Sequence, residues 1–224
     1  MNIASKITDT KSHLPPQVKL LLVSKTQSIA HITEAYVAGQ RFFGENKAQE
    51  LAAKASQLPS DIEWHFIGHL QTNKVRAIAS FVNTVQSVES LRLLSEIDKE
   101  ARRVNRIINC LLQFHIASEE TKFGLDLDEA HALLESQKFK AMLNIRVTGV
   151  MGMATNTDDE NIIRAEFRML RSYYEQLRSS HFAHDASFCE ISMGMSGDYL
   201  IAIEEGSTIV RIGSFIFGER QYNI

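Results

Sequence analysis

The chain has 224 residues, of which 44% are hydrophobic and 23% charged, and its formal net charge is −3. This composition is typical of a folded globular protein, and it excludes disordered and fibrous chains and gives no reason to expect a nucleic-acid or membrane-surface partner. No segment is apolar and long enough for a signal peptide or a membrane span, so the expected compartment is the cytoplasm.

Short apolar or β-branched runs alternate with segments of helical periodicity along the whole chain. In chain order, the pattern predicts strand 18–26, helix 29–39, strand 41–45, helix 47–58, strand 63–68, helix 73–80, strand 81–88, helix 91–103, strand 107–116, helix 127–137, strand 145–153, helix 160–179, strand 188–193, helix 198–205 and strand 208–217. Ser90 is expected to cap the helix at 91–103.

Strands that alternate with helices indicate an α/β fold built from parallel βαβ units. Eight such units in little more than 200 residues favour a (β/α)₈ barrel of the TIM type over an open doubly wound sheet, which is the alternative. Because neither a linker nor a change of composition interrupts the chain, we expect residues 1–224 to form a single domain.

In such a barrel, functional residues are expected at the carboxyl ends of the strands, where their side chains meet at one mouth. Lys25 ends the first predicted strand, on the same face as Leu21 and Val23. A lysine above an apolar layer loses hydration, which lowers its pKa and exposes a neutral amine that can attack a carbonyl. From this residue alone, a lysine that extends from the strand end to water is the simpler interpretation.

Arg211 lies within the last predicted strand between Val210 and Ile212. Because an unpaired guanidinium would be costly there, it must meet a carboxylate, a ligand or solvent. Gly213 follows on the same face and Ser214 comes next. A glycine that lets a ligand approach the backbone, together with free N–H groups and a hydroxyl, suits a phosphate.

The loop after the seventh predicted strand, at 193–197 (MGMSG), adds the hydroxyl of Ser196 and more flexible backbone. Each glycine alone is compatible with a simple turn. The loops after strands seven and eight are, however, the usual phosphate site of these barrels, so glycine and serine in both loops favour phosphate binding.

His65 and His69 have a four-residue spacing that binds metals on helices, but on a strand that runs into a loop their rings would not converge. We predict no metal site, and we expect His65 in the core or as a hydrogen-bonding group. The sequence contains none of the G-x-S-x-G, G-x-G-x-x-G or P-loop motifs of hydrolase, dinucleotide and ATP sites. Cys110 and Cys189 are expected in the core as reduced thiols.

Five segments, in order along the chain, resemble the YggS/PROSC family of pyridoxal 5′-phosphate (PLP) homeostasis proteins, which are related to the barrel domain of alanine racemase. The segments are LLVSKT (21–26), FGEN (43–46) followed by Gln49 and Glu50, WHFIGHLQTNK (64–74), SMGMSGDY (192–199) and AIEEGSTIVRIGSFIFGERQY (202–222). The resemblance spans nearly the whole chain, and five motifs in order are far more specific than any one of them. It implies a barrel that binds PLP.

The resemblance implies roles for individual residues. Lys25 is similar to the family lysine that forms a Schiff base with PLP, and Arg211 to the arginine that faces the pyridine nitrogen. A permanent cation there disfavours protonation of that nitrogen, so the ring withdraws electrons less well than one paired with an aspartate. Other residues match family positions at or near the cofactor, with Ser196, Gly213 and Ser214 at its phosphate: Asn46, His65, Met195 (through its backbone), Ser196, Gly213 and Ser214.

The chain departs from the family pattern in two places. It has His115 where the family usually has Asn, although Glu119, Lys122 and Gly124 still fit the local pattern. The helix that usually precedes the first strand is also expected to be shorter, because the chain starts late.

Three functions compete for such a barrel: a carrier that holds PLP without turnover, a PLP-dependent amino-acid racemase, and a sugar-phosphate isomerase. The isomerase would use Glu45 or Glu190 as a general base, which leaves Lys25 and Arg211 unexplained. Alanine racemase resembles this barrel followed by a β-domain with a catalytic tyrosine, whereas this chain stops at Ile224. We therefore expect a monomeric PLP carrier without catalytic residues, whose partners are PLP and apo forms of PLP-dependent enzymes, with the racemase-like enzyme as the alternative.

Overall fold

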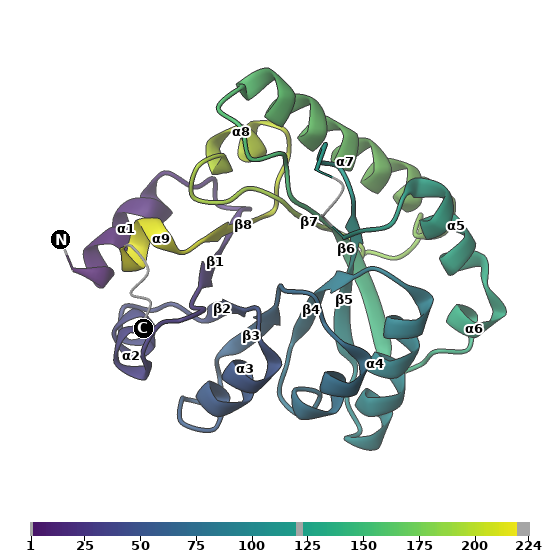
Figure 1. Cartoon of the computed structure of the whole chain (residues 1–224), viewed down its shortest axis with the longest axis horizontal. Coiled ribbons are helices and arrows are strands. Elements are labelled where there is room, and N and C mark those ends of the chain that lie inside the picture. Colours follow the sequence, from purple (N-terminus) through teal and green to yellow (C-terminus); the bar gives the residue numbers. More distant parts are fainter. Residues whose placement is uncertain (1, 120–122, 219–224) are drawn as a thin grey trace.

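A computed structural model describes residues 2–119 and 123–218 of the chain. Eight parallel strands in this part form a closed barrel in which each strand pairs with the next and the last pairs with the first. Viewed along the barrel, the helices surround the ring of strands (Figure 1). The predicted (β/α)₈ barrel is therefore confirmed. Lys122 and residues 219–222, which belong to the predicted motifs, lie outside the described residues.

The strands are short, and each lies within or close to its predicted range. They are β1 (Lys19–Val23), β2 (Phe42–Glu45), β3 (Glu63–Phe66), β4 (Thr84–Val88), β5 (Ile108–Phe114), β6 (Ile145–Gly152), β7 (Glu190–Ser192) and β8 (Ile209–Ile212).

The helices alternate with the strands and cover the outside of the barrel. They are α1 (Ile3–Ser12), α2 (Ile29–Val37), α3 (Ala48–Ala55), the 3₁₀ helix η1 (Thr72–Ala77), α4 (Leu91–Arg103), α5 (Leu127–Glu135), α6 (Gln137–Lys140), α7 (Glu160–His181), α8 (Tyr199–Glu204) and α9 (Ser214–Phe217). Polar side chains begin several of them: Ser90 accepts the backbone N–H of Leu93 at the start of α4, and Asp126 and Glu129 form a capping box on α5.

The structure differs from the sequence prediction at the end of the last strand, in the region 73–80 and after α5. The last strand ends at Ile212 rather than Phe217, because the chain turns at Gly213 and residues 214–217 form α9. A short apolar run such as SFIF has no periodicity that separates strand from helix. The predicted helix at 73–80 is a 3₁₀ helix over Thr72–Ala77, and α6 was not predicted.

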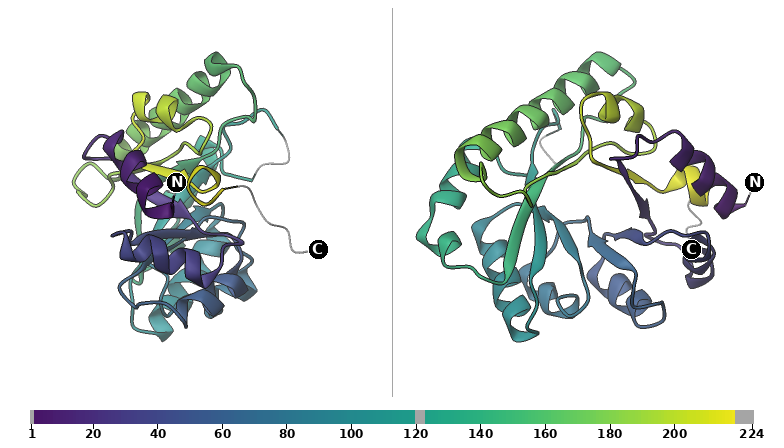
Figure 2. Two further views of the ribbon diagram at one scale, coloured as in Figure 1. Left: turned by 90° about the vertical axis from the view of Figure 1, so that its left-hand side faces the viewer. Right: turned by 180° about the vertical axis from the view of Figure 1, so that it is seen from behind.

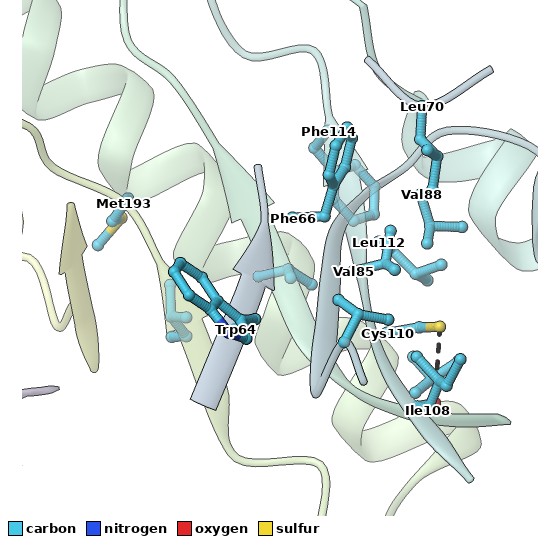
Figure 3. Close-up of a cluster of buried hydrophobic side chains, with 14 of the residues drawn as sticks. Trp64, Phe66, Leu70, Val85, Val88, Ile108, Cys110, Leu112, Phe114 and Met193 are labelled. Atoms are coloured by element: carbon cyan, nitrogen blue, oxygen red, sulfur yellow. Dashed lines mark hydrogen bonds between the residues drawn. The ribbon is translucent and has the colours of Figure 1, made fainter. Parts of the chain in front are cut away.

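The hydrophobic core holds the strands against the surrounding helices. Figure 3 shows part of it, where side chains from β3, β4 and β5, including Trp64, Phe66 and Cys110, pack together. Cys110 is fully buried, and this burial raises the pKa of its thiol. The expectation that Cys189 is also a core residue was wrong, since it is exposed.

Elements from the two ends of the described chain lie side by side. β1 pairs with β8, with Leu21 opposite Arg211, and α1 packs beside α9 on the outside of the same pair (Figures 1 and 2). The two strand ends that carry the main candidate residues are therefore neighbours. Among the described helices, none is both long enough and apolar enough to cross a membrane.

Candidate functional site

A pocket of about 320 Å³ lies at the carboxyl ends of the strands. Small-molecule pockets in proteins usually measure roughly 300–1,000 Å³, so this one suits a compact ligand. The predicted site residues that line it are Lys25, Asn46, Met195, Ser196, Arg211, Gly213 and Ser214.

Lys25 lies on a turn directly after β1, and its neighbours on both sides are held in place. Thr26 has a φ of 65°, a left-handed conformation that is uncommon for a residue with a side chain. Its backbone N–H donates to Glu50 Oε1 at 2.7 Å, and Lys54 Nζ donates to the carbonyl oxygen of Ser24 at 2.8 Å. The polypeptide on either side of Lys25 is thereby fixed relative to α3.

A buried cluster of charges lies behind this turn. Lys54 Nζ also donates to Glu45 Oε1 at 2.8 Å and to Glu50 Oε1 at 2.6 Å, and the Ser24 hydroxyl donates to Glu45 at 2.6 Å. Burial raises the pKa of Glu45 although Lys54 opposes the shift. For Glu50 burial acts in the same direction, but the bonds from Lys54 and Thr26 outweigh it and lower the pKa. Lys54, which follows Glu50 by one helical turn on α3, was not predicted from the sequence.

The two carboxylates considered for an isomerase lie away from the pocket. Glu45 is fully buried and bonded to Lys54. Glu190 is the first residue of β7, at the opposite end of the barrel, where it pairs with Lys19. Neither residue lines the pocket, so the geometry does not support either one as a general base there.

Arg211 is buried near the end of β8 and lines the pocket. Its Nη1 donates to the hydroxyl of Ser192 at 2.8 Å and its Nη2 to the carbonyl oxygen of Gly152 at 2.9 Å. The sequence predicted a carboxylate, a ligand or solvent as its partner, but these two acceptors are uncharged. Burial lowers the pKa of Arg211 to about 10, against the opposing effect of Asp198. The side chain is still a cation at neutral pH.

The two glycine–serine loops meet at one side of the pocket. The hydroxyls of Ser214 and Ser196 lie 3.2 Å apart. A Cβ on Gly213 would come within 2.9 Å of the carbonyl oxygen of Val23, so this position needs glycine for the close approach of β8 to β1. The backbone N–H of Met195, expected to help at a phosphate, donates to Asp198 Oδ1 at 2.5 Å.

His65 lies outside this pocket, although the resemblance implied a position near the cofactor. It is buried inside the barrel, where its Nδ1 lies 2.8 Å from Nε2 of Gln86. Burial lowers its pKa to about 3. The ring borders a smaller cavity of about 120 Å³, which Lys19 and Glu190 also line, towards the amino ends of the strands.

His115 and His69, which the sequence analysis singled out, both have polar partners in the structure. His115 Nε2 lies 2.9 Å from the carbonyl oxygen of Glu119, and His69 pairs with Glu89 on the surface. Within residues 2–119 and 123–218, no three His, Cys, Asp or Glu side chains gather as metal ligands would.

The sequence and the fold both have known relatives. The family model for the alanine racemase N-terminal domain matches residues 1–221. A pyridoxal phosphate homeostasis protein of Aquifex aeolicus is 38% identical over 205 residues, which cover 91% of this chain and 88% of the relative. One from Vibrio cholerae is 38% identical over 212 residues, 92% of this chain and 87% of the relative.

Among solved structures, PipY of Synechococcus elongatus with PLP bound has a TM-score of 0.87 and 33% identity, with 97% of this chain and 100% of that chain covered. An alanine racemase of Bartonella henselae with covalently bound pyridoxal phosphate shares the fold, with a TM-score of 0.71. It is 15% identical, and the match covers 99% of this chain and 60% of the racemase.

Proposed function

Because the chain belongs to the YggS/PROSC family of pyridoxal phosphate homeostasis proteins, we propose that it holds PLP reversibly as a Schiff base on Lys25 and supplies it to apo forms of PLP-dependent enzymes. In this proposal, residues 1–224 form one PLP-binding domain that acts as a monomer. PipY, a relative of the same fold, is known with PLP bound.

The residues around the pocket fit the chemical groups of PLP. Lys25 and Arg211 both line the pocket, and the paired hydroxyls of Ser196 and Ser214 lie at the loops after β7 and β8. PLP supplies an aldehyde that condenses with amines and an electron-withdrawing ring. The hydroxyls suit its phosphate, while Arg211 is an N–H donor for its ring nitrogen.

The proposed attachment is a reversible condensation on Lys25. Lys25 would hold PLP through a C=N bond between its Nζ and the aldehyde carbon, with the aldehyde oxygen released as one water. Addition of water reverses the step and releases PLP. Since the fixed neighbours of Lys25 hold its backbone in one place, the amine is presented to the pocket without a search over turn conformations.

One observation favours a carrier over a racemase. Among the described residues that line the pocket, Lys25 and Arg211 are those with ionisable side chains. Racemisation needs an acid and a base on opposite faces of the substrate carbon. Arg211 is a poor second acid–base group, because it remains a cation at neutral pH, and such a cation also disfavours protonation of the pyridine nitrogen.

A spectroscopic titration tests the proposed binding. Wild-type protein titrated with PLP is expected to develop the visible band of a Schiff base, which Lys25→Ala abolishes and Lys47→Ala, a change at an exposed lysine, retains. Borohydride reduction followed by peptide mapping is expected to place the trapped cofactor on Lys25. A wild-type protein without the band, or a cofactor trapped on another lysine, would contradict the proposal.

An activity assay separates the carrier from the racemase-like alternative. The PLP-loaded protein is incubated with L-alanine, and D-alanine is measured. Turnover at ordinary enzyme rates, roughly 1–10³ s⁻¹, would show that the protein is a racemase. We expect no such turnover.

A further inference from the structure

A chain of hydrogen bonds leads from Arg211 into the barrel interior. Arg211 Nη1 donates to Ser192 Oγ at 2.8 Å, and the Ser192 hydroxyl donates to Gln86 Oε1 at 2.7 Å. Nε2 of Gln86 then lies 2.8 Å from Nδ1 of His65. The four residues come from β8, β7, β4 and β3, and all are buried. This chain connects the pocket to the smaller cavity at the other end of the barrel.

The protonation state of His65 gives the whole chain one direction. Burial lowers the pKa of His65 to about 3, so the ring is neutral at physiological pH. Because the Gln86 atom that faces Nδ1 is Nε2, which can only donate, Nδ1 of the neutral ring accepts from it and the ring proton is on Nε2 of His65. With its amide N–H directed to His65, Gln86 can present only its oxygen to Ser192. The Ser192 hydrogen therefore points to Gln86, and its oxygen is left to accept from Arg211.

We propose that Ser192, Gln86 and His65 are positioning residues that fix the guanidinium of Arg211 against the pyridine nitrogen of PLP. This proposal rests on the proposed function. An arginine side chain has several rotatable bonds, and ordering it in one geometry costs conformational entropy. Ser192 is itself held in a single orientation by Gln86 and His65, so the guanidinium is already ordered before the ligand binds. The entropy of the side chain is then not lost on binding.

The residues of this hydrogen-bond chain are uncharged, which affects how much of the positive charge of Arg211 acts on the ligand. Ser192, Gln86 and neutral His65 carry no net charge, and the second acceptor of the guanidinium, the carbonyl of Gly152, is also uncharged. A carboxylate in place of Ser192 would neutralise much of the positive charge of Arg211. The uncharged chain instead orients the guanidinium and leaves its charge directed at the pocket.

The experiment compares two buried serines near the ends of β7 and β8. Ser192→Ala removes the hydroxyl that bonds to Arg211. Ser207→Ala removes a hydroxyl that donates to backbone carbonyls, including those of Met193 and Ile209. The readouts are the Kd for PLP, the absorption maximum and visible circular dichroism of bound PLP, and the Tm without PLP.

Ser192→Ala is expected to weaken PLP binding about tenfold, the size of one hydrogen bond to a charged group. It should also change the visible circular dichroism, because the ring is held less firmly. Ser207→Ala is expected to lower the Tm but to leave the Kd and the spectrum of bound PLP as in the wild type. Equal effects of the two variants on Kd and spectrum would show a merely structural role and overturn the proposal.

Conservative replacements separate the hydroxyl from the space that it fills. Threonine and valine have nearly the same volume, but only threonine keeps the hydroxyl. Ser192→Thr is therefore expected to retain the wild-type dichroism and Ser192→Val to lose it. At the far end, His65→Gln keeps an acceptor for Gln86, whereas His65→Leu removes it. The same dichroism in His65→Gln and His65→Leu would remove His65 from the chain.

Failure of this proposal is distinguishable from failure of the proposed function. A wild-type protein that gives no PLP band overturns both. A wild-type protein that binds PLP on Lys25, together with a Ser192→Ala variant of unchanged affinity and dichroism, overturns the positioning chain alone.

Discussion

Lys54 Nζ lies 2.8 Å from Glu45 Oε1, and the two side chains are only 8% and 0% exposed. The pair is one connection away from Lys25, because Lys54 also donates to the carbonyl of Ser24 and Glu45 accepts from the Ser24 hydroxyl. A buried ion pair of this kind is expensive to break from one side, since it leaves a charge without its partner in a place that water does not reach.

Lys54→Met is therefore expected to lower the free energy of unfolding by about 3–5 kcal/mol. It should also weaken PLP binding, because the turn that carries Lys25 loses one of its supports. Urea denaturation measures the first effect and absorbance titration the second. In the double variant Glu45→Gln/Lys54→Met the buried charge is gone, so most of the stability should return. A double variant as unstable as Lys54→Met would show that the uncompensated charge of Glu45 is not the cause.

The two serine hydroxyls at the glycine–serine loops are expected to act on the phosphate alone. Ser196→Ala and Ser214→Ala should each weaken PLP binding about tenfold, since each removes one hydrogen bond to a charged group. Pyridoxal, which has the aldehyde and ring but no phosphate, should bind equally to the wild type and both variants. An equal loss for both compounds would place these hydroxyls elsewhere than at the phosphate.

Gly213 is expected to resist replacement for a steric reason. In Gly213→Ala the new Cβ would lie 2.9 Å from the Val23 carbonyl oxygen and 3.1 Å from its Cβ, so β8 and β1 must move apart. Overpacking of this kind costs about 1–3 kcal/mol of unfolding free energy. Gly197→Ala is the matched control for stability, because its Cβ would meet nothing within 4 Å. Equal unfolding free energies for the two variants would contradict this prediction.

His65 is expected to make the protein less stable in mild acid. Its pKa is about 3 in the folded protein and about 6.5 in an unfolded chain, so below pH 6.5 the unfolded state binds a proton that the folded state refuses. The free energy of unfolding is therefore unaffected by His65 above pH 6.5, and protonation of His65 in the unfolded state lowers it as the pH falls towards 3. Between pH 7 and pH 5 this loss amounts to about 2 kcal/mol.

The variant His65→Gln isolates this contribution. Glutamine offers Gln86 an acceptor but does not titrate, so urea denaturation at pH 7 and pH 5 should show a smaller pH dependence than in the wild type, by about 2 kcal/mol. Groups such as His181, whose pKa is also lowered, contribute to both proteins and cancel in the difference. An unchanged pH dependence would mean that another group titrates.

The order of strands and helices could be predicted from the sequence because each element has its own local pattern. The start of α4 is an example, where Ser90 precedes an amphipathic segment and caps it as expected. Lys25 and Arg211 could likewise be found, because a charged residue inside or at the end of an apolar strand is conspicuous. The barrel then brings both to one mouth.

Long-range partners had no such local signal. Lys54 looks like one more lysine on an exposed helix, and only the closed barrel shows that it is buried against Glu45. Ser192 and Gln86 look like ordinary strand residues in the sequence. Only the packing of β4 and β7 in the barrel brings Ser192 Oγ to 2.7 Å from Gln86 Oε1. The position of His65 depended on which face of β3 points into the barrel and at what depth, which a four-residue strand does not specify.

During synthesis, Lys25 leaves the ribosome long before the strand that closes the ring against β1. A nascent chain that ends before β8 has neither Arg211 nor the loop at Gly213, so it lacks part of the lining of the pocket and the strand that pairs with β1. Contacts between segments so far apart in the chain form late in folding. PLP binding, as proposed, is therefore expected to begin only when β8 has joined the barrel.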